Sequence, residues 1–113
     1  NPHKRLGLIS QIPKFPDGYT VAQKTKIDRL YRVVYINDNM PTINYVQRWN
    51  ADINRALDTE KTEYSKIVVG EFSGVTYTNK NVVTVTFWDD TYNYTLTGKI
   101  SEEELIEIAK SIK

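Results

Sequence analysis

Side chains able to do chemistry gather most densely near the C-terminus, in TFWDDTYNYTLTGKISEEELIEIAK at residues 86–110. Two carboxylates that flank a substrate are the machinery of glycoside hydrolysis, and clustered carboxylates also hold hard cations such as calcium. Asp89 and Asp90, however, lie between two runs in which apolar and polar residues alternate. Aspartate in that setting usually hydrogen-bonds to its own backbone. We therefore expect both residues in a hairpin turn and assign neither a catalytic nor a metal role.

The second acidic group, Glu102–Glu104, directly follows Ser101. A serine three residues before a glutamate is a capping box, in which the hydroxyl accepts from the glutamate N–H and the carboxylate reaches back to the serine N–H. Negative charge is also favoured in the first turn of a helix. These glutamates are therefore predicted to begin a helix.

Other catalytic systems find little support. The chain has no cysteine and one histidine, His3, in a proline-rich stretch, so it offers neither a thiolate nor a positioned imidazole. Asp89, Asp90 and Asn93 lack the spacing and glycine of a calcium loop, and the glycines are too scattered for a phosphate-binding loop. We expect no enzyme, no cofactor and no metal, and a hydrolase with two distant carboxylates is the weakest alternative.

Charge and hydropathy exclude two further classes. Fifteen basic and fourteen acidic residues leave a net charge of +1 over 113 residues. Nucleic-acid binding depends on clustered positive charge, so we expect no nucleic-acid partner. No apolar run approaches the ~20 residues that span a bilayer. A chain of this length predicts a single domain with its own core.

Alternating apolar and polar residues predict strands through most of the chain. Residues 1–14 are expected to be an extended lead-in, because proline disfavours helix in the residue before it. Residues 29–50 read as an antiparallel hairpin. The remaining expectations are a helical turn at 6–10, a Pro-Asp-Gly turn at 16–18, a strand from Tyr19, a weak helix within 50–60, strands at 63–69, 75–78, 83–88 and 92–97, a bend bracketed by Gly70 and Gly74, and a turn at 79–81.

The C-terminal segment has helical periodicity. Leu105, Ile108, Ala109 and Ile112 form an apolar stripe, and burial of each large member contributes roughly 1.5–3 kcal/mol. This stripe requires an apolar surface to cover. The predicted fold class is therefore α+β, a twisted antiparallel β-sheet of about six or seven strands with a C-terminal α-helix packed on one face. Residues 15–113 are expected to form this domain.

The strands are rich in aromatic residues. At strand spacing such side chains are mostly cross-strand pairs of a core, although tyrosine and tryptophan are also enriched at binding surfaces. Trp49 is the preferred exception, because Arg48 and Asn50 flank it and an irregular segment follows. The candidate interaction surface consists of Tyr45, Trp49, Trp88 and Tyr92.

Several motifs occur in the order typical of one family. They are Pro-Asp-Gly-Tyr at 16–19, Leu-Asp-Thr-Glu at 57–60, Val-Gly-Glu-Phe-Ser-Gly at 69–74, and the C-terminal TFWDD, YNYTLTG and ISEEELIEIAKSI. Residues 15–113 thereby resemble a domain-of-unknown-function family. That family is found as the extracytoplasmic domain of anti-sigma-factor-like and sporulation-associated membrane proteins of Gram-positive bacteria. The chain departs from the family's usual Leu-Pro-x-Gly-Tyr in having Phe15 before the proline.

The resemblance implies a non-catalytic sensing or protein-interaction domain at the outer face of the cell membrane. It would be tethered through a segment absent from this chain, its partner would be a protein or a cell-envelope component, and no active-site residue carries over. The alternative is a carrier or binding module for an apolar small molecule between helix and sheet. A pocket lined by Leu105, Ile108 and strand tyrosines would favour the carrier, and a solid core with an exposed aromatic patch would favour the interaction domain.

Overall fold

The computed structural model describes residues 13–15, 17–27, 30–49 and 64–112. Within these ranges the chain forms seven strands followed by an α-helix. The elements are β1 (Thr20–Ile27), β2 (Leu30–Asn37), β3 (Met40–Trp49), β4 (Tyr64–Val69), β5 (Phe72–Asn79), β6 (Val82–Trp88), β7 (Tyr92–Gly98) and α1 (Glu102–Lys110). No helix in this described part of the chain is long and apolar enough to cross a bilayer.

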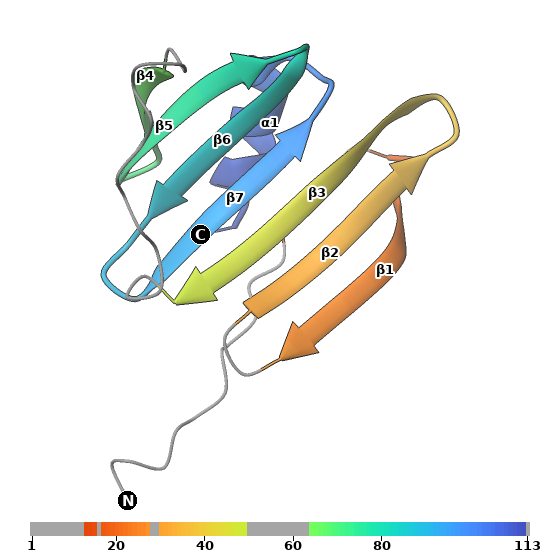
Figure 1. The fold of residues 1–113 in the computed structure, drawn as a ribbon, viewed down its shortest axis with the longest axis horizontal. Helices are drawn as coiled ribbons and strands as arrows, with labels where there is room; N and C mark the ends of the chain where they lie inside the picture. The colour runs from red at the N-terminus through yellow and green to blue at the C-terminus, as the bar shows by residue number, and fades with distance from the viewer. Residues whose placement is uncertain (1–12, 16, 28–29, 50–63, 113) are drawn as a thin grey trace, which may run out of the picture.

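The strands form one antiparallel sheet in the order β1-β2-β3-β7-β6-β5-β4. Two runs of hairpins, β1–β3 and β4–β7, meet where β3 pairs with β7 at the centre. Figure 1 shows the two runs side by side, with α1 behind the second run. The predicted class is confirmed, because the structure is a twisted, open antiparallel sheet with a C-terminal helix on one face.

Successive residues of a strand point to opposite faces, which gives the sheet two distinct surfaces. We call the face covered by α1 the helix face. There the register aligns Gln47, Tyr94 and Phe87 on neighbouring strands. We call the other the open face, where Arg48, Asn93 and Trp88 form the adjacent row.

The hydrophobic core lies on the helix face. Helix α1 contacts β4, β6 and β7, and the side chains of Leu105, Ile108 and Ala109 are at most 3% exposed. Ile112, just beyond the helix, is buried as well. The apolar stripe expected from the sequence is therefore the surface that α1 places on the sheet.

The predicted turns are largely confirmed, with one correction. Gly18 has a φ of +97°, and Lys80 and Asn81 both have positive φ, as a two-residue hairpin of the primed type requires. Gly74, expected to bound a bend with Gly70, instead lies inside β5. A Cβ at Gly74 would lie 2.5 Å from the carbonyl oxygen of Thr86, so glycine is needed there for close backbone approach.

Two expected elements lie outside the described residues. They are the helical turn at residues 6–10 and the weak helix within residues 50–60. Lys14 and the residue before it, the described end of the lead-in, have no regular secondary structure, as expected, and neither has Phe15.

Candidate functional site

The carboxylate of Asp89 organises the turn between β6 and β7. Its Oδ1 accepts the backbone N–H groups of Thr91 and Tyr92, both at 2.7 Å, and its Oδ2 accepts the hydroxyl of Tyr94 at 3.2 Å. Burial, and then the charge of Asp89, raises the pKa of Tyr94 well above its ordinary value. The turn role expected for Asp89 is confirmed.

The second acidic group caps the helix. The Ser101 hydroxyl accepts from the backbone N–H of Glu104 at 3.1 Å and donates to Glu104 Oε1 at 3.0 Å. Glu102, Glu103 and Glu104 occupy the first turn of α1, where the helix dipole favours negative charge. The predicted cap of the Glu104 N–H by the Ser101 hydroxyl is confirmed, whereas the Glu104 carboxylate accepts from that hydroxyl in place of the expected backbone N–H of Ser101.

The structure does not bring the four predicted aromatic residues onto one surface. Tyr45 is fully buried and Tyr92 is 8% exposed, both on the helix face. Trp49 pairs with Tyr92 across the β3–β7 ladder, with ring centroids 5.0 Å apart. Trp88 lies opposite Asn93 and therefore points to the open face. Tyr45 and Tyr92 belong to the core, and the two half-buried tryptophans lie on opposite sides of the sheet.

Tyr45 is an example of what the aromatic residues do instead. Its hydroxyl donates to the Oε1 of Gln47 at 3.5 Å, and its ring makes an edge-to-face contact with Tyr31. Burial, followed by the nearby Tyr94, raises the pKa of Tyr45 above its ordinary value. These residues are satisfied core groups, and they offer no surface to a ligand.

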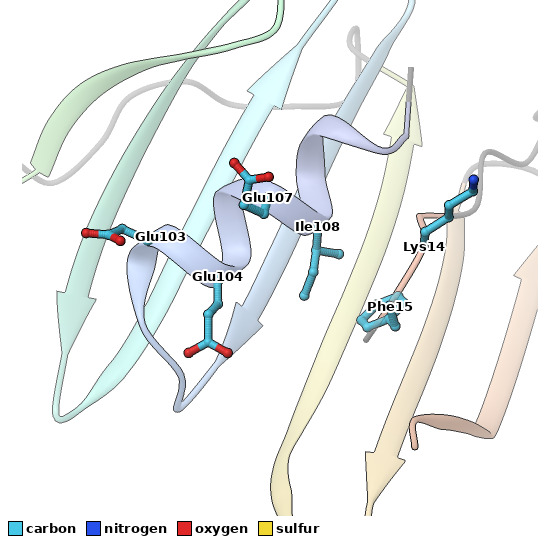
Figure 2. Close-up of a pocket in the computed structure, with 6 residues that line it drawn as sticks. All are labelled: Lys14, Phe15, Glu103, Glu104, Glu107 and Ile108. Atoms are coloured by element: carbon cyan, nitrogen blue, oxygen red, sulfur yellow. The ribbon is translucent and has the colours of Figure 1, made fainter. Parts of the chain in front are cut away.

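A groove of about 400 Å³ that carries charged groups runs beside α1. Glu103, Glu104, Glu107 and Ile108 line it from the helix, and Lys14 and Phe15 line it from the segment that precedes β1. Figure 2 shows Phe15 across the groove from Ile108.

The segment that contains Lys14 and Phe15 is held in place by two contacts, one to Ser111 and one to Tyr35. The backbone N–H of Lys14 donates to the Ser111 hydroxyl at 2.6 Å, and that hydroxyl donates to the carbonyl oxygen of Ile108, also at 2.6 Å. The ring of Phe15 stacks on Tyr35 with centroids 3.7 Å apart. These contacts bring a segment from the start of the chain against the C-terminal end of α1.

The groove has an anionic side and an apolar floor. Glu107 forms an ion pair with Lys110 at 3.2 Å, and Glu104 accepts from Ser101, whereas Glu103 has no partner among the described residues. Burial, and then the charge of Glu104, raises the pKa of the nearby Tyr19. The Tyr19 hydroxyl donates to the carbonyl oxygen of Pro41. Such a surface suits a segment that places a cation next to an apolar side chain.

The described residues include no group of three or more His, Cys, Asp or Glu able to hold a metal ion. A second, smaller pocket of about 160 Å³ lies beside the β4–β5 turn, lined by Val69–Phe72, Phe87 and Ala109–Lys110. Neither pocket is lined by Leu105 or by a strand tyrosine. Neither of these two pockets therefore has the full lining of Leu105, Ile108 and strand tyrosines that would favour an apolar carrier.

Sequence reasoning missed Lys14 and Phe15 as part of a site. Phe15 was visible only as a departure from the usual leucine of the resembling family, and nothing in its neighbours indicates that it faces a helix 90 residues later in the chain. Glu103 was assigned to the helix start, which is correct, and Glu107 lies about one turn further along the same helix. Their part in a groove depends on where the lead-in packs.

Comparison with protein families matches residues 11–112 to the domain of unknown function DUF4367. No curated protein and no solved structure matches the chain. The family match covers nearly the whole chain. The chain therefore belongs to the DUF4367 family of domains of unknown function.

Proposed function

We propose that this chain is a non-catalytic extracytoplasmic sensing or protein-interaction domain of a membrane-anchored regulator of the anti-sigma-factor-like kind. Its partner would be a protein whose docking segment presents a lysine or arginine beside an apolar residue. The single observation that carries this proposal is the groove beside α1, whose lining combines three glutamates and one lysine with the apolar side chains of Phe15 and Ile108.

Two features of the chemistry support a binding role. The carboxylates of Asp89 in the hairpin turn and Glu104 in the helix cap accept from backbone and hydroxyl donors, so these two are not free to act as a general acid and base. The groove is broad and lies on the outside of a filled core, which is typical of protein docking and not of small-molecule capture.

Site-specific photo-crosslinking in cells that produce the full-length protein tests this proposal. A benzophenone amino acid replaces Glu103 in the groove, and the matched control carries it at Asp90, an exposed acidic residue of the β6–β7 turn. We expect a covalent adduct with one envelope protein from position 103 and none from position 90. Added protease should digest the domain in cells whose wall is removed but whose membrane is intact.

The second variant removes the groove floor. Phe15→Ala should reduce the yield of the adduct at least fivefold, because an aromatic anchor in a pocket typically contributes 1–2 kcal/mol or more to binding. Equal adducts from positions 103 and 90, or a domain that resists protease until the membrane is broken, would contradict the proposal. Circular dichroism of each variant checks that the sheet remains folded.

A further inference from the structure

The open face of the sheet has an unusual distribution of charge. None of the seven strands contains an aspartate or glutamate, and the described acidic residues lie in turns and in α1. Three cations, Arg32, Arg48 and Lys66, project from the open face, because they align with Val46, Asn93 and Val75 on neighbouring strands. All three are exposed and have no ion pair or hydrogen bond to a described residue.

The same face carries most of the exposed large hydrophobic side chains. Of the six in the described chain, four lie on it, namely Ile27, Ile36, Tyr64 and Val68, with exposures from 37% to 67%. Val21, by contrast, lies opposite Tyr35 on the helix face. Cationic and exposed apolar side chains therefore share one face, and the glutamates of α1 lie on the other side of the molecule.

The arrangement within the face distinguishes a lipid surface from a protein partner. A protein interface has an apolar centre and a polar rim. Here the centre is mixed, because Asn93 and Thr95 on β7 and Thr86 on β6 are linked by hydrogen bonds of 3.1–3.3 Å, while the half-buried Trp88 lies beside the buried Asn93. No large apolar side chain of the described residues is exposed at this centre. The exposed apolar residues instead lie on the outer strands β1, β2 and β4, at the two margins of the face. Seven strands spaced about 4.8 Å apart make this face roughly 29 Å wide.

We propose that the open face docks on an anionic phospholipid surface, with Arg32, Arg48 and Lys66 over the headgroups and the marginal apolar side chains at the interface. Basic side chains next to exposed apolar ones are the combination by which peripheral segments bind anionic bilayers. This inference rests on the membrane attachment of the proposed function, since a tether keeps the domain within reach of a weakly bound surface. Docking in this way turns the groove of α1 away from the membrane, toward a partner.

Vesicle co-sedimentation of the whole chain tests the charge requirement. We expect binding to vesicles that contain phosphatidylglycerol and phosphatidylcholine, and little binding to phosphatidylcholine alone. Arg32→Gln with Arg48→Gln should lower the partition coefficient about thirtyfold, since each cation near such a surface contributes roughly 1 kcal/mol. The matched control, Lys24→Gln with Lys26→Gln, removes the same charge from the helix side of edge strand β1, and it should lower binding less than about threefold because of salt screening.

A second measurement reports the orientation directly. Because the chain has no cysteine, an environment-sensitive dye can be attached at a single Asn44→Cys on the open face or a single Glu103→Cys on α1. The labelled chain is held on vesicles by an N-terminal histidine tag and a nickel-chelating lipid. With phosphatidylglycerol present, the dye at position 44 should shift to shorter wavelength and the dye at position 103 should not.

Three results would overturn the proposal. The first is an equal loss of vesicle binding for the double arginine variant and the double lysine variant, and the second is a dye response at position 103 in place of position 44. The third is a dimer in solution that the double arginine variant no longer forms, which would assign the face to a second copy of the chain. Failure here leaves the groove test untouched, because the crosslink from position 103 depends on α1 and Phe15 and not on the open face.

Discussion

The adjacent aspartates of the β6–β7 turn provide a stringent test of the structure. Asp89 accepts two backbone N–H groups and the hydroxyl of Tyr94, whereas Asp90 is exposed and makes no hydrogen bond to a described residue. The two differ by one position in the sequence and carry the same charge. Replacing each by alanine therefore separates the hydrogen-bonding role from any general effect of lost negative charge.

The expected magnitude follows from what each substitution leaves behind. Asp89→Ala removes the acceptor of the Tyr94 hydroxyl, and Tyr94 is a fully buried residue. A buried donor that is left without a partner costs about 1–3 kcal/mol. The Tyr92 N–H is partly buried and adds about 1 kcal/mol, while the exposed Thr91 N–H can bond to water. We expect a loss of about 3 kcal/mol for Asp89→Ala and less than about 0.5 kcal/mol for Asp90→Ala.

Urea and thermal unfolding, both followed by tryptophan fluorescence, measure both variants. For 113 residues a loss of 3 kcal/mol corresponds to a fall in Tm of roughly 12 °C. Tyr94→Phe, alone and combined with Asp89→Ala, completes a double-mutant cycle, in which we expect a coupling of about 1–2 kcal/mol. Equal losses for Asp89→Ala and Asp90→Ala, or no coupling to Tyr94, would refute the assignment of the carboxylate as the organiser of this turn.

Three further outcomes are expected from the same unfolding assay. Ser101→Ala should cost about 1 kcal/mol through loss of the helix cap, and an unchanged midpoint would contradict that role. Gly74→Ala should cost about 1–3 kcal/mol, because its Cβ would collide with the backbone of β6; a neutral effect would mean that the two strands can separate. Burial raises the pKa of Tyr45 and Tyr94, so the folded state keeps protons that the unfolded state loses above about pH 10. Stability should therefore be constant from pH 7 to 9 and fall as the pH rises above 10, and a flat profile to pH 12 would contradict their burial.

Much of the fold could be predicted because its signals are local. Period-two alternation locates the strands. The Lys80–Asn81 turn and the Asp89 turn use residue types with known backbone preferences, and Ser101 with Glu104 marks the start of a helix. Each of these depends on groups within a few residues of one another. The α+β class follows, since an apolar helical stripe after a series of strands must cover a sheet.

The aromatic candidate surface shows where such reasoning stops. Alternation indicates that a strand has two faces, but which face is buried depends on the neighbours that a strand acquires. Trp88 and Tyr92 lie on opposite faces because the register pairs Trp88 with Asn93. Tyr45 is buried because β3 becomes a central strand through its pairing with β7, about 50 residues away in the chain.

Residue type and short-range spacing specify the strands, the turns and the helix cap, and the sequence contains no cysteine. Tertiary packing places Phe15 across from α1 to form an acidic groove, and the pairing of the strands brings Arg32, Arg48 and Lys66 onto one open face. Both surfaces join segments distant in the chain. Their geometry is set by the long-range register of the sheet and by the packing of the helix, which no local pattern specifies.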